Sequence, residues 1–256
     1  MEISTSIERY IAAVPKAELH VHLEGSIQPA TLLTLAQRNS VQLPVQTEAE
    51  MQRWFTFRDF NHFIEIFFAI SSCLKSVEDY ELIAYEFGAN MARQHVRYAE
   101  VTFSPSTHQF SLGIPSDTYF EGLTRGRLRA KAEFGVEIRW VFDIVRDIPD
   151  RELNRLRAEY TVAVALEGMK DGVVTLGLGG AEIDHPPEHY ATWFEKALAA
   201  GLHSAPHAGS HSLSARSTNT VGSMPNEQYP PRRVRRYEQP PLPAPLSCGD
   251  THQREL

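Results

Sequence analysis

Short apolar segments alternate with helical patterns along residues 1–209, and this alternation constrains the fold more than any other feature of the sequence. Each segment predicts a buried strand. The five segments are residues 17–23, 98–103, 137–144, 173–178 and 203–209. Strands that are separated by helices pair in parallel as βαβ units. The sequence therefore predicts an α/β fold.

The helical patterns between these segments have recognisable ends. Ser76 followed by Asp79 resembles a capping box. The apolar residues that follow recur on one helical face, at Tyr80, Ile83, Ala84, Phe87 and Met91. A second helix is predicted from about residue 116 to Gly135. A third, which carries Phe194, is predicted to end at Gly201, because glycine is usual just past a helix C-terminus.

The interval between the first two strands is roughly twice as long as the later intervals and contains a further helix, over about residues 58–74. One face of this helix carries apolar side chains, at Phe60, Phe63, Ile64 and Phe67. Such a face is typical of a lid over a functional site and equally of a helix that packs on the core. The sequence leaves both interpretations open.

A closed barrel of the common type has eight βα units, whereas this sequence shows about five. The predicted fold is therefore a partial (β/α)8 TIM-type barrel. From residue 210 onward, seven prolines exclude helices and central strands. Six arginines and four acidic residues give this tail a net charge of +2, whereas the whole chain carries −7. We expect residues 210–256 to be disordered.

Composition and charge exclude several classes of protein. The charge of −7 argues against a large nucleic-acid-binding surface. No apolar run approaches the roughly 18 residues of a membrane span, and the first residues lack the basic and apolar parts of a secretory signal. Cys73 and Cys248 are too few and too far apart for a disulfide scaffold. A cytoplasmic location is therefore expected.

Three histidines are candidate metal ligands. Side chains alternate along a strand, so His20 and His22 project to the same face at the end of the first strand, where an α/β barrel has its active face. His207 lies at the end of the fifth strand. Three nitrogen ligands and a water are a common catalytic zinc arrangement. The pair His20 and His22 alone is weak support for a metal site. The combination of this pair with His207 at another strand end favours a metal site.

The sequence resembles the adenosine deaminase family, a zinc-dependent branch of the amidohydrolase barrels. The resemblance spans nearly all of residues 7–209. The matching segments are residues 16–26 (KAELHVHLEGS), 97–101 (RYAEV), 177–182 (GLGGAE) and 207–209 (HAG).

This resemblance implies the roles of individual residues. It implies that His20, His22 and His207 bind Zn²⁺, and that His22 and Glu24 also contribute to substrate binding, with Glu24 at the substrate's sugar. It further implies that the backbone at Gly180 approaches the purine. The cluster of glycines near Gly180 is compatible with this close approach and also with a simple turn at a strand end.

The implied activity is hydrolytic removal of the 6-amino group of a purine. In this family zinc activates the attacking water, and carboxylic acid and basic groups transfer the protons. The implied substrate is adenosine, adenine or an aminofutalosine-type nucleoside. Glu24 favours the last two, because many adenosine deaminases have aspartate there.

The match to the family breaks at Ser210, where the family has the glutamate that protonates the ring nitrogen. Serine cannot replace that acid, because a hydroxyl does not titrate near neutral pH. Neither the family's Gly-His-Gly strand nor its Asp-Asp strand end occurs after Gly209 in this sequence. No catalytic residue set is therefore intact, and we expect this chain to be inactive.

The abruptness of this break suggests a change of reading frame near codon 210. The chain would then comprise a truncated deaminase barrel at residues 1–209 and an out-of-frame tail at residues 210–256. The rival hypothesis is a genuine shortened protein with a functional tail. In either case, an open sheet with two free edges predicts poor solubility.

Two other functions remain open. The chain is a non-catalytic zinc- or purine-binding remnant if it holds metal without deaminating purines. It is another amidohydrolase, acting on esters or amides, if it releases product from those compounds and no ammonia from purines. The long match over residues 16–26 favours a purine deaminase over the latter.

Overall fold

The computed structural model describes residues 2–208, with the side chains of residues 2–5, 60 and 61 excluded. All of these residues belong to one compact unit, Met1–Ala215. The predictions made for residues 210–256, including the disordered tail and the role of Ser210, lie outside the described residues.

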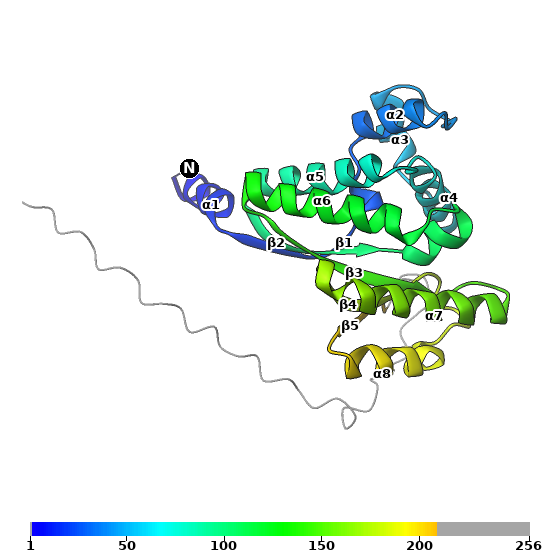
Figure 1. Cartoon of the computed structure of the whole chain (residues 1–256). Coiled ribbons are helices and arrows are strands. Elements are labelled where there is room, and N and C mark those ends of the chain that lie inside the picture. The colour runs from blue at the N-terminus through cyan, green and yellow to red at the C-terminus, as the bar shows by residue number, and fades with distance from the viewer. Residues whose placement is uncertain (1, 209–256) are drawn as a thin grey trace, which may run out of the picture. The chain divides into compact units, whose positions relative to one another are not determined.

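The described chain forms one parallel sheet of five strands, whose spatial order follows their order in the sequence (Figure 1). The strands are β1 (Lys16–His22), β2 (Val96–Phe103), β3 (Glu137–Val145), β4 (Val173–Gly179) and β5 (His203–Pro206). Each strand is joined to the next by at least one helix, as βαβ units require. The sheet is a half-barrel, and the predicted α/β fold with five βα units is confirmed.

Helices cover the outside of this half-barrel. In Figure 1, α5 and α6 lie side by side near β2, whereas α7 and α8 lie along β3, β4 and β5. The α-helices are α1 (Glu2–Ala13), α2 (Pro29–Arg38), α3 (Glu48–Trp54), α4 (Phe60–Ser71), α5 (Val77–Arg93), α6 (Ser116–Phe134), α7 (Arg151–Glu167) and α8 (Ala191–Ala199). Shorter helical segments are η1 (Glu24–Ser26), η2 (Thr107–Ser111), η3 (Gly168–Asp171) and η4 (Pro187–Tyr190).

The predicted helix ends agree with the structure. Helix α5 begins after Ser76, whose side chain accepts a hydrogen bond from the backbone of Asp79 while the Asp79 side chain accepts one from the backbone of Ser76. This reciprocal pair is the predicted capping box. Helix α6 ends at Gly135, which adopts a left-handed conformation with φ of 66°. Gly201 follows α8 with φ of 103°.

The core lies between the sheet and the helices that cover it. Aromatic rings from three elements meet there, with the Phe103 ring centroid 6.1 Å from that of Tyr80 and 5.2 Å from that of Tyr119. All three side chains are fully buried. The apolar face predicted for α5 is buried along its whole length, which fixes this helix against β2.

The prediction that all five strands are buried is wrong for β1 and β5. Leu19 in the middle of β1 is 61% exposed, and every residue of β5 is exposed. These two strands are the edges of the open sheet, so within residues 2–208 each has a neighbouring strand on one side only. The inner strands β2, β3 and β4 are largely buried, as predicted.

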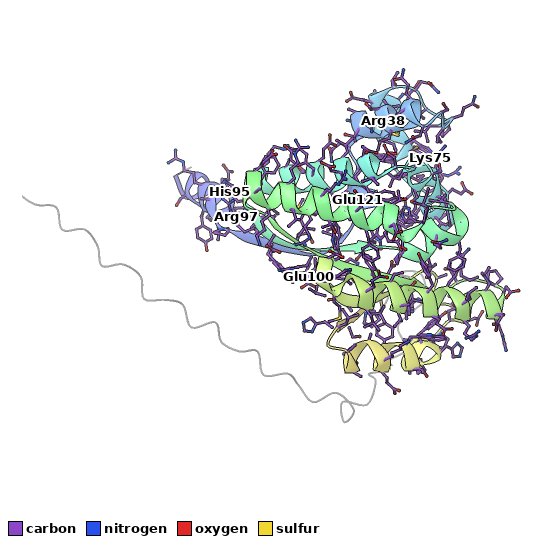
Figure 2. The ribbon with its side chains drawn as sticks, viewed as in Figure 1. Arg38, Lys75, His95, Arg97, Glu100 and Glu121 are labelled. Atoms are coloured by element: carbon purple, nitrogen blue, oxygen red, sulfur yellow. The ribbon has the colours of Figure 1, made fainter. Side chains whose placement is uncertain are left out.

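Figure 2 labels Arg38 on α2 and Glu121 on α6, two charged residues on the helices outside the sheet. Arg38 joins the end of α2 to the start of α5 through an ion pair with Asp79 at 2.9 Å. Figure 2 shows His95 and Arg97 near α1, where β2 begins. Within residues 2–208, no helix combines the length and the apolar character required to cross a membrane.

Candidate active site

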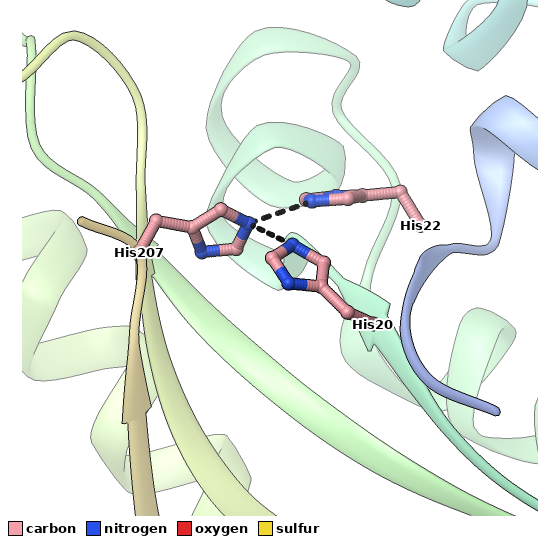
Figure 3. A group of neighbouring side chains, drawn as sticks. All are labelled: His20, His22 and His207. Atoms are coloured by element: carbon pink, nitrogen blue, oxygen red, sulfur yellow. Dashed lines mark hydrogen bonds between the residues drawn. The ribbon is translucent and has the colours of Figure 1, made fainter. Parts of the chain in front are cut away.

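The structure brings together three histidines that are far apart in the sequence (Figure 3). His20 and His22 project from β1, and His207 directly follows β5. The Nε2 atom of His207 lies 2.9 Å from Nε2 of His20 and 3.1 Å from Nε2 of His22. Curvature of the sheet thus places ring nitrogens from its two edge strands within contact distance.

The protonation of these histidines suits metal binding. Burial, together with the nearby His22 and His20, lowers the pKa of His207 to about 4. Burial is also the main cause that lowers the pKa of His22, although Glu24 opposes it. At neutral pH these two imidazoles are therefore neutral and retain lone pairs, as metal ligands must.

The crowding of the three nitrogens is itself informative. A neutral imidazole has one N–H donor, so the Nε2 atoms of His20 and His22 can at best share the single Nε2 lone pair of His207. The buried Nδ1 atom of His207 has no hydrogen-bond partner among the described residues. A divalent cation between the Nε2 atoms would take one lone pair from each of the three rings, and an all-nitrogen donor set suits zinc. The residues present therefore fit a zinc ion.

A cavity of about 220 Å³ opens beside the histidines, at the carboxyl ends of the strands. It is lined by His22, Phe63, Ile64, Phe67, Phe68, Ser104, Thr107, Asp143, Val145, Asp147, Ile148, Arg157, Gly179, Gly180 and His207. In a parallel barrel the carboxyl ends of the strands form the active face. The cavity and the histidines therefore belong to one site.

Helix α4 supplies the apolar wall of this cavity. Phe63, Phe67 and Phe68 line the cavity, and Phe67 is also largely buried. The ring of Phe67 lies edge-on to His22, with 6.5 Å between the ring centroids. The predicted apolar face of this helix thus lines the site, whereas the helix packs on the core through other residues, Ile66 and Ile70.

Gly180 lies at the rim of the cavity in a conformation that only glycine adopts readily. Its φ is +89°, and a Cβ atom there would collide with a carboxylate oxygen of Asp147. Because it has no side chain, the backbone at Gly180 is open to the cavity. The structure is thus compatible with close approach of a flat ligand to this residue.

Asp143 is a cavity residue that the sequence analysis missed. It lies near the end of β3, is 2% exposed, and accepts a hydrogen bond of 2.6 Å from Ser104. Burial raises the pKa of Asp143 to about 7, and the charge of Glu24 adds to this shift. At neutral pH the carboxyl therefore exists in both protonation states, so that it can donate or accept a hydrogen bond.

Arg146 was also missed, and it connects two strand ends. Its side chain is 1% exposed and donates hydrogen bonds to the backbone carbonyls of His207, at 2.9 Å, and Gly180, at 3.3 Å. Glu182 provides its counter-charge at 3.4 Å. The guanidinium therefore fixes His207 relative to the loop at Gly180.

Glu24 occupies a fully buried position beside the site. Its Oε1 atom is 2.9 Å from Nε2 of His108, and Nδ1 of His108 is 2.6 Å from the hydroxyl of Tyr80. The Oε2 atom of Glu24 is buried and has no hydrogen-bond partner among the described residues. Glu24 is not among the residues that line the cavity, so its contact with a substrate stays a prediction.

Comparison with known proteins identifies the family. The sequence profile of the family described as "Adenosine deaminase" matches residues 15–221, most of the chain. The chain belongs to the adenosine deaminase family. The resemblance predicted from the sequence spanned residues 7–209. The family profile begins to match later, at residue 15, and ends later, at residue 221.

Individual relatives within the family act on purine-type substrates, as their names state. The chain is 39% identical over 213 residues to the aminodeoxyfutalosine deaminase of Streptomyces coelicolor, covering 81% of this chain and 53% of the relative. It is 32% identical over 209 residues to the adenine deaminase of Cupriavidus necator, covering 82% of this chain and 58% of the relative. The chain thus spans about half the length of the curated relatives it matches.

Solved structures of an adenine deaminase and of an amidohydrolase are similar to this chain in fold. The adenine deaminase of Arthrobacter aurescens matches with a TM-score of 0.67 at 28% identity, covering 77% of this chain and 58% of that chain. An amidohydrolase from Burkhoderia ambifaria with bound Zn matches with a TM-score of 0.68 at 28% identity, covering 82% of this chain and 56% of that chain. The half-barrel is thus similar to about half of each deaminase-type barrel.

Proposed function

We propose that residues 1–209 form the zinc- and purine-binding part of a purine deaminase. The observation that carries this proposal is the convergence of three histidine Nε2 atoms at the wall of a cavity lined by apolar residues and a buried carboxyl. Membership of a deaminase family supports it.

His20, His22 and His207 would hold the zinc ion. When bound, zinc supplies the chemistry of hydrolysis, because it lowers the pKa of water. The phenylalanines of α4 would exclude bulk water and contact a flat ring, and the absence of a side chain at Gly180 would leave room for that ring. Asp143 donates a hydrogen bond to a ring nitrogen or accepts one from an amine, according to its protonation state.

We propose that this chain binds a purine without turnover. Ser210 stands where the family has its acidic glutamate, and a serine hydroxyl is too weak an acid to replace a carboxylic acid near neutral pH. The family's catalytic histidine and aspartate pair have no counterparts in residues 210–256 of this sequence. Residues 1–256 would therefore bind zinc and a purine without deaminating it, and a reading-frame change near codon 210 would account for the sequence of residues 210–256.

The substrate class recognised is a purine nucleoside of the aminofutalosine type or adenine. The higher identity to an aminodeoxyfutalosine deaminase, 39% against 32% for an adenine deaminase, supports the nucleoside. Glu24 supports both of these classes over adenosine.

Two measurements test this proposal. Calorimetric titration of the zinc-loaded chain with adenine and adenosine should show saturable binding, and an ammonia assay with the same compounds should show no release above a zinc-only control. Absence of purine binding would overturn the proposed site, whereas ammonia release would overturn the proposed loss of turnover. Sequencing the DNA around codon 210 separately tests its proposed origin, since another frame should encode a glutamate after His-Ala-Gly.

A further inference from the structure

Three buried polar side chains form a hydrogen-bonded chain beside the histidines. Glu24, His108 and Tyr80 come from η1, η2 and α5, and all three are fully buried. The Nε2 atom of His108 lies 2.9 Å from Oε1 of Glu24, and its Nδ1 atom lies 2.6 Å from the hydroxyl of Tyr80. Elements that are far apart in the sequence therefore meet at one carboxylate.

The hydrogen bonds of this chain are directed toward Glu24. An ionised carboxylate only accepts hydrogen bonds, so Nε2–H of His108 donates to Oε1. A neutral His108 then accepts at Nδ1 from the Tyr80 hydroxyl, which keeps its proton because burial raises the pKa of Tyr80. The ring of Phe103 stacks on that of His108, with 4.5 Å between the centroids. His108 is thus held at both nitrogens and on its ring, and it orients the Glu24 carboxylate.

The local backbone gives His108 its position. Segment η2 is a short π-helix, a rare conformation that is frequent at functional sites. Within it, Thr107 lines the cavity, whereas His108 is buried and reaches Glu24. Adjacent residues of one turn therefore belong to the cavity wall and to the buried chain.

This chain compensates the Glu24 carboxylate only in part. The Oε2 atom of Glu24 is buried and has no hydrogen-bond partner among the described residues. Within residues 2–208, no lysine or arginine forms an ion pair with Glu24. A negative charge that is removed from water without a full counter-charge is costly, so Glu24 would stabilise a cation bound close to it.

The histidine cluster is where such a cation would bind. Glu24 follows the proposed ligand His22 by two residues, at the carboxyl end of β1. Burial lowers the pKa of His22 and raises that of Asp143, and the charge of Glu24 raises both, so its charge reaches two residues that line the cavity. Neutral imidazoles bring no negative charge to a divalent cation, and within the described chain no carboxylate joins the three histidines in their cluster.

We propose that the buried carboxylate of Glu24, oriented by His108 and Tyr80, is the counter-charge of a divalent cation held by the three histidines. This inference rests on the zinc site proposed above and adds no ligand to that site. Opposite charges attract strongly where water is excluded, so a fixed carboxylate raises the affinity for the cation without contacting it. His108 and Tyr80 are positioning residues, which act on the cation through Glu24.

The experiment measures the zinc affinity of the full chain by competition with a chromophoric chelator, and uses Co²⁺ as a second probe. Glu24→Gln removes the charge and keeps the shape, so we expect the zinc affinity to fall by about tenfold or more. The visible absorption spectrum of the Co²⁺-loaded variant should match that of the wild type, because the three nitrogen ligands are unchanged. The matched control is Glu86→Gln, which neutralises a half-buried carboxylate of α5 that accepts from Thr31 and should leave the zinc affinity unchanged.

Three further variants test the positioning of Glu24. His108→Leu removes the donor to Oε1 and should lower the zinc affinity by about threefold or more, whereas His108→Gln, whose amide donates, should restore most of it. Tyr80→Phe removes only the hydroxyl and should lower the affinity by less than His108→Leu does. Urea unfolding of the metal-free variants gives their stability in parallel. The zinc affinity should follow the presence of a donor to Glu24 rather than this stability.

The outcomes separate this inference from the proposed function. Equal zinc affinities of the wild type and Glu24→Gln would overturn the counter-charge and leave the histidine site intact. A changed Co²⁺ spectrum in Glu24→Gln would also overturn it, because Glu24 would then act on the geometry of the ligands. Absence of zinc binding by the wild type would overturn the histidine site together with this inference. If Glu24→Gln does not fold, equal zinc affinities of His108→Leu and His108→Gln would overturn the inference, and a higher affinity of His108→Gln would support it.

Discussion

The buried guanidinium of Arg146 donates a hydrogen bond of 2.9 Å to the backbone carbonyl of His207. His207 directly follows an edge strand whose residues are all exposed, so side-chain packing of that strand fixes its position only in part. The same guanidinium donates to the carbonyl of Gly180. Arg146 therefore positions a proposed zinc ligand and the cavity rim together.

Replacing Arg146 should weaken zinc binding although Arg146 is not a ligand. Arg146→Lys keeps the charge but loses the planar guanidinium that donates to the carbonyls of His207 and Gly180. Because His207 is then held less firmly, we expect the zinc affinity to fall by about tenfold or more. Competition with a chromophoric chelator measures this affinity. Arg139→Lys, which changes an arginine of the same strand β3 that is paired with Glu137, should leave it unchanged. Equal zinc affinities for the Arg146 variant and the wild type would show that Arg146 does not position His207.

Substitution of Gly180 should impair the purine site specifically. Gly180→Ala combines an unfavourable φ of +89° with a collision against Asp147, and we expect adenosine affinity to fall by about tenfold or more. Gly113→Ala is the matched control, because Gly113 also has a positive φ, +71°, but a Cβ atom added there would have no neighbouring atom within 4 Å. Both variants should lose roughly 1 kcal/mol of stability or more. If both bind adenosine as the wild type does, Gly180 is a simple turn residue.

Asp143 should give the protein a measurable pH dependence of stability. Its pKa is about 7 in the folded chain and about 4 in an unfolded chain, so the folded state binds the proton more tightly. The free energy of unfolding should therefore decrease as pH rises from about 4 to about 7, by at most about 4 kcal/mol from this group. Above that window the contribution of this group is constant.

The Asp143→Asn variant isolates this effect, because its amide oxygen still accepts the hydrogen bond from Ser104. Urea unfolding at pH 5 and pH 8 should show a smaller decrease in stability for the variant than for the wild type. The same pH dependence in both proteins would contradict the raised pKa.

The open edge at β1 should promote self-association. Leu19 is 61% exposed on an edge strand, where unpaired backbone groups and an apolar side chain favour contact with other chains. Leu19→Lys should reduce concentration-dependent association in sedimentation velocity. Leu128→Lys changes a leucine that is 51% exposed on helix α6 and should have little effect. A wild-type chain that stays monomeric and melts cooperatively would count against this prediction.

The elements that sequence analysis predicted best are those specified locally. The strands β2, β3 and β4 are rich in apolar residues, and α5 begins at a capping box whose two residues are three positions apart. The exposure of β1 and β5 was not predicted, because it depends on which strands lie at the edges of the sheet. The identity of an apolar residue such as Leu19 does not indicate whether another element of the fold covers its side chain.

The histidines were identified because two of them alternate on one strand and the third ends another. Arg146 was missed, since its role depends on the backbone carbonyls and the counter-charge that the fold brings near it. Asp143 carried a usable signal, namely an acid within the apolar run at residues 140–145, near the carboxyl end of β3. A charged residue in that position is costly unless it is paired or functional.

The zinc content of the purified full chain tests the central claim most directly. After removal of metal with a chelator and reloading with zinc, elemental analysis should give about one zinc per chain for the wild type, held by nitrogen ligands as proposed. His207→Ala should retain less than about a tenth of that amount, whereas His189→Ala, which changes an exposed histidine of η4, should retain all of it. Equal zinc content in the wild type and His207→Ala would contradict the proposed metal centre.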